Sequence, residues 1–223
     1  MALAAAAAPT LSTTSLDGQR GDRSLFRDLS MALLPGQVVW LRGRNGRGKT
    51  SLLRLLAGLS VPAGGAVLCG AQPLSTLAAD WRRRLVYIGH ASALKDDMTV
   101  AECLHFAAAL QGRRHSGAEI DAALACWSIL ALRDVPVRRL SQGQRRRTAL
   151  ARLALPHPPS IWLLDEPFDA LDDEGVQTLC ALLSKQAARG GSVMLTSHQT
   201  LPLRDPLPLT LDLDALDDLT LAA

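Results

Sequence analysis

The chain has 223 residues, of which 48% are hydrophobic and 20% are charged, so it can bury the core of one globular domain. Its formal net charge of +3 is too small to indicate a nucleic-acid partner. The four cysteines show no CxxC spacing, and no uninterrupted apolar run approaches the ~20 residues of a membrane-spanning helix, which argues against a zinc site, a disulfide framework and a direct membrane span.

The first segments of the chain predict a leader followed by short strands. Ala2 to Ala8 lack the basic region and the strongly apolar core of a signal peptide, so residues 1–9 are interpreted as a disordered leader. Strands are predicted at Leu11–Leu16 and over Met31–Leu41, the latter interrupted by a turn at Pro35-Gly36.

A strand, a glycine-rich loop and a helix then follow in succession. Val38–Leu41 is apolar, as a buried strand would be, and leucines recur at helical spacing from Lys49 to Leu59. The loop Gly43–Thr50 matches the pattern GxxxxGK[ST]. Its glycines let backbone N–H groups point at phosphate oxygens, while Lys49 supplies a positive charge and Thr50 offers a hydroxyl to Mg²⁺. The residues predicted to bind ATP are Gly43, Arg44, Asn45, Gly46, Arg47, Gly48, Lys49, Thr50 and Ser51.

The middle of the chain predicts a helical region. Strands are expected at Ala66–Cys69 and Leu85–Ile88, ahead of this region. Val100–Leu132 has helical spacing, interrupted by a polar loop at Gly112–Gly117. We interpret residues 91–140 as a helical subdomain inserted between the nucleotide-binding motifs.

The remaining segments alternate between helix and strand. A helix is predicted over Gln142–Leu155, with Ser141 as its N-cap, and a second helix from about Asp173 to Ala188. Ile161–Leu164 and Ser192–Thr196 are predicted strands.

This alternation predicts an α/β fold of the P-loop NTPase type, with a mostly parallel sheet flanked by helices and a small antiparallel β part. Residues 10–200 are interpreted as one domain and residues 201–223 as an acidic C-terminal tail. Two arginine clusters, Arg82–Arg84 and Arg145–Arg147, are interpreted as solvated faces of helices.

Two acidic residues end the apolar run Ile161–Leu164. Because ligands of open α/β sheets collect at the carboxyl ends of the strands, Asp165 and Glu166 are expected beside the phosphate loop. A carboxylate at Asp165 is suited to hold Mg²⁺ through water, and Glu166 to polarise an attacking water as a general base.

The order of these motifs resembles that of the ATP-binding subunits of ABC transporters. An LSxGQ segment, Leu140–Gln144, stands between the phosphate loop and the acid pair, and the resemblance runs from about Leu11 to Gln199. It implies a Mg²⁺-dependent ATPase of ABC type in which Glu166 is catalytic and His198 is the switch histidine that contacts the γ-phosphate. It also implies signature residues that serve a nucleotide bound to a second subunit, namely Ser141, Gln142, Gly143 and Gln144.

More narrowly, the chain is similar to the ATP-binding subunits of the haem exporter of cytochrome c maturation. The similarity is carried by Asn45–Leu59, Ile88–His90, Asp165–Asp172 and Thr196–Gln199. Most ABC ATPases have Gln at the position of His90, where it contacts Mg²⁺ and couples to the membrane subunit. His90 is therefore a candidate for coupling, and its role as a metal ligand stays open.

Two positions depart from the usual ABC pattern. Gln142 stands where Gly is commonest. The aromatic residue that commonly stacks on adenine is missing, because counting back from the phosphate loop reaches Arg20 and Arg23, while Phe26 lies too close to the loop. We therefore expect loose recognition of the base and tolerance of GTP.

The resemblance also implies an assembly. Two copies of this chain would work with two copies of a transmembrane permease, engaged through residues 90–99, as peripheral proteins on the cytoplasmic face of the bacterial inner membrane. Haem, or its delivery to apocytochromes, would be handled by those partners, and no nucleic acid is implied.

Three other functions stay open as alternatives. The chain could serve another small ABC importer or exporter, act as a soluble ABC protein on nucleic acid or the ribosome, or be a binding module without catalysis. The absence of a long coiled coil or a second ATPase domain argues against the soluble protein. The presence of Lys49, Asp165, Glu166 and His198 argues against loss of catalysis.

Overall fold

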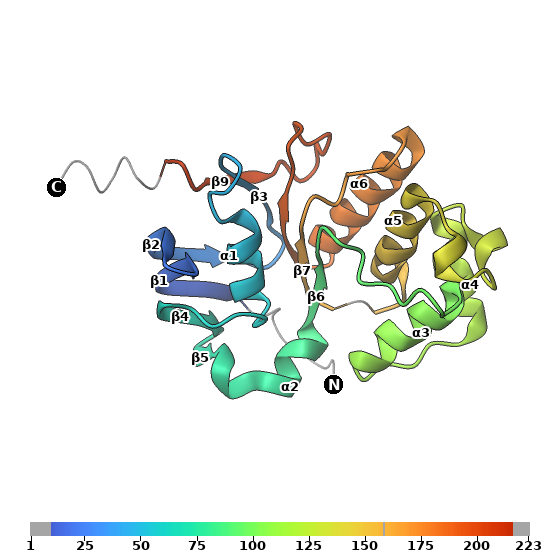
Figure 1. Cartoon of the computed structure of the whole chain (residues 1–223), viewed down its shortest axis with the longest axis horizontal. Coiled ribbons are helices and arrows are strands. Elements are labelled where there is room, and N and C mark those ends of the chain that lie inside the picture. Colours follow the sequence, from blue (N-terminus) through green and yellow to red (C-terminus); the bar gives the residue numbers. More distant parts are fainter. Residues whose placement is uncertain (1–9, 158, 216–223) are drawn as a thin grey trace, which may run out of the picture.

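A computed structural model of the chain describes residues 10–157 and 159–215, so the expected leader at residues 1–9 lies outside the described residues. Figure 1 shows an antiparallel sheet with helix α1 on one side of the molecule and helices α3, α4, α5 and α6 on the other, with the strands of a second sheet between them. No helix within these described ranges is long and apolar enough to cross a membrane.

The antiparallel sheet has the order β2-β1-β4-β5. Its strands are β1 (Leu11–Arg20), β2 (Arg23–Leu33), β4 (Gly64–Cys69) and β5 (Gln72–Pro73). The predicted strand at Leu11–Leu16 is therefore part of a longer one. The register of β1 against β2 shifts after Thr13, where Ser15 has a φ of 45°, so a strictly alternating pattern does not run through the whole strand.

The second sheet is parallel throughout and has the order β6-β7-β8-β3-β9. Its strands are β6 (Leu85–Ile88), β7 (Ile161–Leu164), β8 (Ser192–Thr196), β3 (Val38–Arg42) and β9 (Leu209–Asp212). Every residue of β7 and β8 is buried, because elements cover both faces of the sheet. The expected turn at Pro35-Gly36 leads from the antiparallel sheet into β3 of the parallel sheet.

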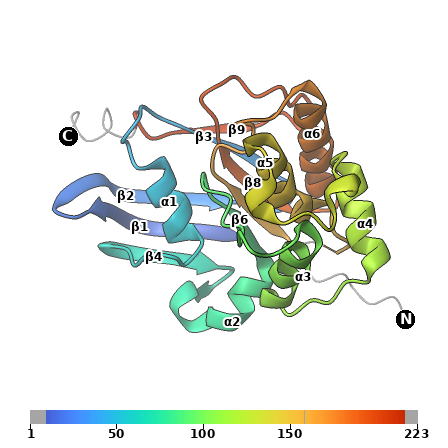
Figure 2. The ribbon, with the colours of Figure 1, turned by 45° about the vertical axis from the view of Figure 1, so that its right-hand side comes forward.

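Successive residues of β7 pack into two different cores. Ile161 and Leu163 face a cluster that contains Leu52 and Leu53 of α1 (Lys49–Leu56) and the antiparallel sheet. Trp162 and Leu164 face the cluster of the helices α3 (Val100–Leu110), α4 (Gly117–Cys126), α5 (Gln142–Leu150) and α6 (Asp173–Ala188). This alternation follows from the two-residue period of a strand, and it fixes β7 between the two halves of the molecule (Figure 1). Figure 2 shows the same division, with the antiparallel sheet and α1 on one side and the helices α3, α4 and α6 on the other.

Several elements were not expected from the sequence, among them the short strand β5. Helix α2 (Leu74–Arg84) lies between β5 and β6 and ends with the exposed cluster Arg82–Arg84. Strand β9 pairs in parallel with β3, so the sheet continues past residue 200, where the sequence analysis ended the domain. The predicted helix over Gln142–Leu155 is divided into α5 and a 3₁₀ segment at Ala151–Ala154.

Candidate active site

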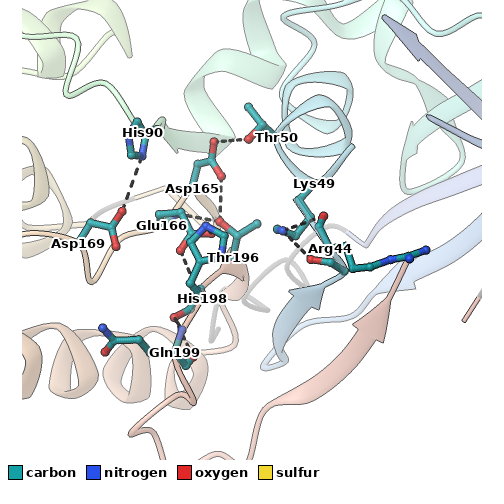
Figure 3. Close-up of polar contacts among 12 residues, drawn as sticks. Arg44, Lys49, Thr50, His90, Asp165, Glu166, Asp169, Thr196, His198 and Gln199 are labelled. Carbon is teal, nitrogen blue, oxygen red and sulfur yellow. Dashed lines mark hydrogen bonds and ion pairs between the residues drawn. The ribbon is translucent and has the colours of Figure 1, made fainter. Parts of the chain in front are cut away.

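The carboxyl ends of β3, β7 and β8 open into one cleft of about 250 Å³. Figure 3 shows the phosphate loop on one side of this cleft and the acid pair with His198 on the other. The residues that line it are Arg20, Leu25, Asn45, Gly46, Gly48, Lys49, Thr50, Ser51, His90, Asp165, Glu166 and His198. Arg44 and Arg47 belong to the loop but do not line the cleft.

The phosphate loop joins β3 to the N-terminus of α1. Gly48 is the N-cap of this helix and has a φ of 102°, which a residue with a side chain rarely adopts. A Cβ atom at Gly48 would also lie 3.0 Å from Leu25 Cβ, so both the backbone path and the space require glycine. The helix therefore presents its free N–H groups and the positive end of its dipole to the cleft.

The Lys49 side chain folds back over the loop. Its Nζ donates hydrogen bonds to the carbonyl oxygens of Gly43, at 2.6 Å, and Arg44, at 3.3 Å (Figure 3). These contacts hold the ammonium group at the mouth of the loop, where an anionic ligand would accept the same donors.

The outer side of the loop is held by the segment that follows β9. The Arg44 backbone N–H donates to Asp214 Oδ2 at 2.8 Å, and the Arg47 Nε lies 3.2 Å from Asp214 Oδ1. Arg47 also donates to the carbonyl oxygens of Leu213, at 3.0 Å, and Leu25, at 3.1 Å. Arg44 and Arg47 thus brace the loop instead of facing the cleft.

Asp165 directly follows β7, and 2% of its surface is exposed. Its Oδ2 accepts a hydrogen bond from Thr50 Oγ1 and its Oδ1 accepts one from Thr196 Oγ1, both at 2.8 Å. Thr196 was missed by the sequence analysis, although its position as the polar end of the apolar strand β8 parallels that of Asp165 on β7. The Thr50 and Asp165 oxygens are hard ligands that suit Mg²⁺, which prefers one or two carboxylates together with phosphate oxygens.

Glu166 follows in a left-handed backbone conformation, with a φ of 48° that is uncommon outside glycine. Its N–H donates to Thr196 Oγ1 at 2.8 Å. Its Oε2 accepts a hydrogen bond from the His198 backbone N–H at 3.0 Å, and its Oε1 lies 3.4 Å from His198 Nε2. The Glu166 side chain is 9% exposed and lines the cleft, so it is shielded from water on most sides and open toward the cleft.

His90 lines the same cleft but contacts neither Asp165 nor Thr50. Its Nδ1 lies 3.7 Å from Asp169 Oδ2, and its side chain is 75% exposed. In the ranges 10–157 and 159–215, no group of three or more His, Cys, Asp or Glu side chains is arranged to hold a metal ion. His90 also borders a neighbouring cavity of about 450 Å³ that includes Gln142.

The signature residues lie outside the cleft. Ser141 caps α5 by accepting the Gln144 N–H at 3.3 Å, while Gln144 Oε1 accepts the Ser141 N–H at 2.9 Å. Ser141 and Gln142 are exposed and Gly143 is half-buried, so the start of α5 is open to another molecule. The N-cap predicted at Ser141 is confirmed.

One arginine cluster is not the solvated helix face that the sequence predicted. Arg146 is only 4% exposed, and its guanidinium donates to backbone carbonyl oxygens around the acid pair. Arg147 is partly buried and pairs with Asp172 at 2.5 Å, whereas Arg145 pairs with Asp96 on the surface at 2.7 Å. The three neighbouring arginines therefore have three different environments, because only one side of α5 faces the acid pair.

The phosphate loop, the acid pair and His198 meet at the carboxyl edge of one parallel sheet, and the helical region beside it exposes the start of the LSQGQ helix. This arrangement defines an ATPase domain of ABC type. The sequence model described as ABC transporter matches residues 26–169. The chain is 45% identical over 194 residues to the cytochrome c biogenesis ATP-binding export protein CcmA of Methylococcus capsulatus, which covers 87% of this chain and 93% of that protein. It is 47% identical over 196 residues to the protein of the same name from Pseudomonas fluorescens, over 86% of this chain and 90% of the relative. The chain therefore belongs to the ABC transporter family, in the branch of the cytochrome c biogenesis ATP-binding export proteins.

A solved structure supports the same fold. An ABC transporter ATP-binding protein from Pyrococcus furiosus matches with a TM-score of 0.78 and 24% sequence identity, over 92% of this chain and 98% of that chain. The predicted α/β fold with a parallel sheet, an antiparallel part and a helical region is thus confirmed, as is the predicted family. Membership of this family gives the chain ATP as its nucleotide and ATP hydrolysis as its reaction.

Proposed function

We propose that this chain is the energy-coupling subunit of an ABC transporter of c-type cytochrome biogenesis, and that it supports either the export of haem or the release of a haem carrier. The catalytic part of this proposal is supported by one continuous chain of hydrogen bonds at the cleft. The chain runs from Thr50 through Asp165, Thr196 and Glu166 to His198. The biogenesis part is supported by the names of relatives that match most of the chain.

The cleft suggests how the residues divide the work. Lys49 would leave the loop carbonyls and bind β- and γ-phosphate oxygens instead. The free N–H groups at the start of α1 would bind the same phosphates. Thr50, together with Asp165 through water, would hold Mg²⁺, which supplies positive charge against the phosphates. Glu166 would accept a proton from the attacking water, and His198, which follows the neighbouring strand β8, would contact the γ-phosphate.

The exposed start of α5 supports a dimer of this chain. Ser141 and Gln142 do not line their own cleft and are open to another molecule, so Ser141, Gly143 and Gln144 would serve the nucleotide of a second copy. We place two copies with two copies of a transmembrane permease at the cytoplasmic face of the bacterial inner membrane. His90, which borders both the cleft and the neighbouring cavity, would link the nucleotide to the permease.

The proposed function can be tested in a bacterial strain whose own gene for this chain is deleted and which then produces a variant of the chain. Lys49→Ala should abolish ATP-dependent function, so covalently bound haem in c-type cytochromes should fall at least about tenfold, while b-type haem signals persist. Lys185→Ala, which changes an exposed lysine on α6, should restore the wild-type level.

Two outcomes would contradict the proposal. Normal c-type cytochromes in a strain without the chain would favour another small ABC transporter. Normal cytochromes with Lys49→Ala would show that ATP is not needed. Affinity purification of the tagged chain from detergent-solubilised membranes should recover one membrane protein in equal amount.

A further inference from the structure

Arg146 is a buried cation on the second turn of α5, two residues after the signature segment. Its guanidinium donates hydrogen bonds to Gly89 O at 3.1 Å, Asp165 O at 3.0 Å and Pro167 O at 3.3 Å, and also to Glu166 O. Three of these carbonyls belong to consecutive residues of the acid-pair segment, and the fourth belongs to the loop that carries His90. One side chain therefore holds both loops to α5.

The acid-pair segment needs such a partner. Glu166 has a left-handed backbone, so the carbonyls around it leave the regular pattern of the sheet. Buried carbonyls require donors, and the planar guanidinium carries five N–H donors in a fixed fork that can serve several acceptors at once. No other described side chain donates to the carbonyls of both Asp165 and Glu166 among the hydrogen bonds of residues 10–157 and 159–215.

The charge at this position is balanced locally. Burial lowers the pKa of the Arg146 guanidinium, while the carboxylates of Asp169, Asp165 and Glu166 act in the opposite direction. Arginine stays protonated in proteins, so a permanent positive charge lies against the backbone of the acid pair without lining the cleft.

We propose that Arg146 is the positioning residue that fixes the backbone of Glu166, and so aims its carboxylate at the cleft and at His198. This inference rests on the proposed function, in which Glu166 is the general base. Arg146 does not line the cleft, so it acts through Glu166 and does not touch the nucleotide.

The test uses the purified full chain and four variants: Arg146→Met, Arg146→Lys, Glu166→Gln and the double variant Arg146→Met with Glu166→Gln. Arg146→Met keeps an unbranched apolar stem, is shorter than arginine, and removes every donor. Because displacement of a catalytic group by about 1 Å can cost ~10²-fold, kcat should fall by roughly 10- to 100-fold. The Kd for ATP, measured by calorimetry, should stay within about twofold, since the phosphate loop is untouched.

The double variant separates positioning from general damage. If Arg146 acts through Glu166, its loss should change the single-turnover rate of Glu166→Gln by less than about twofold, because the two effects are coupled. An equal fold-loss in both backgrounds, or an unchanged kcat of Arg146→Met alone, would overturn the proposal. Arg145→Met is the matched control, since Arg145 lies on the same helix but pairs with Asp96 at the surface, and it should keep the wild-type kcat.

Arg146→Lys covers the case in which the methionine variant does not fold. Lysine keeps the charge but offers a single ammonium in place of the fork, so we expect a loss of kcat of about three- to tenfold that also disappears in the Glu166→Gln background. A wild-type kcat for Arg146→Lys would overturn the proposal. Rapid hydrolysis by the Glu166→Gln variant would instead contradict the proposed function, because Glu166 would then not be the general base. Slow hydrolysis by Glu166→Gln together with a normal kcat for Arg146→Met would contradict only the role of Arg146.

Discussion

Glu166 and His198 touch at two points, although they come from different strand ends. The His198 backbone N–H donates to Glu166 Oε2 at 3.0 Å, and the His198 ring Nε2 lies 3.4 Å from Glu166 Oε1. The His198 side chain is 56% exposed and the Glu166 side chain only 9%, so the histidine forms the open side of a nearly buried acid. A small movement after β8 would therefore change the surroundings of both carboxylate oxygens.

Glu166→Gln should stop hydrolysis while leaving the geometry of the cleft in place. A glutamine oxygen can still accept the His198 N–H, but the amide cannot take a proton from water. We expect kcat to fall by about 10²–10⁴-fold with ATP affinity retained, and dimers to accumulate when ATP is present. Steady-state hydrolysis and size-exclusion chromatography measure these effects. Glu174→Gln, on the exposed first turn of α6, is the control, and hydrolysis by Glu166→Gln above a tenth of the wild-type rate would contradict the prediction.

The base of the nucleotide should be bound with little selectivity. Phe26 is 4% exposed, and its ring packs so closely over Gly18 that an added Cβ there would collide with it, so it is not free to stack on a base. Arg20, by contrast, lines the cleft at the end of β1. We expect ATP and GTP to bind within about tenfold of each other, and Arg20→Ala to weaken both alike.

A competition assay with a fluorescent nucleotide measures this preference. Arg23→Ala is the matched control, since Arg23 is exposed and does not line the cleft. A strict preference for ATP, or an effect of Arg20→Ala on one nucleotide alone, would show that the base is recognised in another way.

Asp214 should support the phosphate loop from behind. It accepts the Arg44 N–H and lies 3.2 Å from Arg47 Nε, so Asp214→Ala removes the brace without entering the cleft. We expect the Kd for ATP to rise by about three- to tenfold. Calorimetric titration measures it, and Asp22→Ala, at the exposed turn between β1 and β2, should leave it unchanged. Equal affinities for both variants would mean that the loop keeps its shape without Asp214.

Asp172 should make the stability of the chain depend on pH in the acid range. The hydrogen bond from the Gly175 N–H, and then that from Arg147, lower the pKa of Asp172 from its ordinary value of 3.8. An acid whose pKa is lowered by folding stabilises the native state above its ordinary pKa, and this stabilisation is lost as the pH falls through the lowered value. Asp172→Ala should lower the Tm by about 2–4 °C at pH 7, because it removes the N-cap of α6 and the partner of Arg147.

The difference in Tm between Asp172→Ala and the wild-type chain should narrow below pH 3.8. Thermal unfolding, followed by circular dichroism from about pH 2.5 to about pH 7, measures this difference on both sides of the ordinary pKa of Asp172. Asp173→Ala, at the next position, should have the smaller effect at pH 7. A difference that stays constant over this range would show that the charge of Asp172 does not contribute.

The strands of the parallel sheet could be predicted because their burial is complete. Ile161–Leu164 is apolar at every position, as a strand covered on both faces must be, and the predicted bounds match β7. The bounds of α6 also match, because its apolar positions recur at helical spacing after an acidic N-cap. Helix α2 was missed since it is mostly polar, with Trp81 as its one well-buried aromatic residue in the described part of the helix.

The parts of the site that could not be predicted depend on the way distant segments meet. Strand β9 has two leucines alternating with Thr210 and Asp212, but Leu209 is 52% exposed and the acidic surroundings conceal the pattern. The burial of Arg146 follows from contacts with residues 19 to 57 positions away. The spacing of Arg146 with the buried Ala149 and Leu150 was the available signal, because these positions share one face of a helix.

The pairing of β3 has a consequence for the order in which the protein can be assembled. This strand, which carries the phosphate loop, pairs with β8 on one side and with β9 on the other, and both neighbours are synthesised more than a hundred residues later. Contacts so distant in sequence form late, because a large part of the chain must first be brought together. The growing polypeptide therefore completes its ATP site only near the end of synthesis, and nucleotide binding at full affinity becomes a sign that synthesis has passed Asp214.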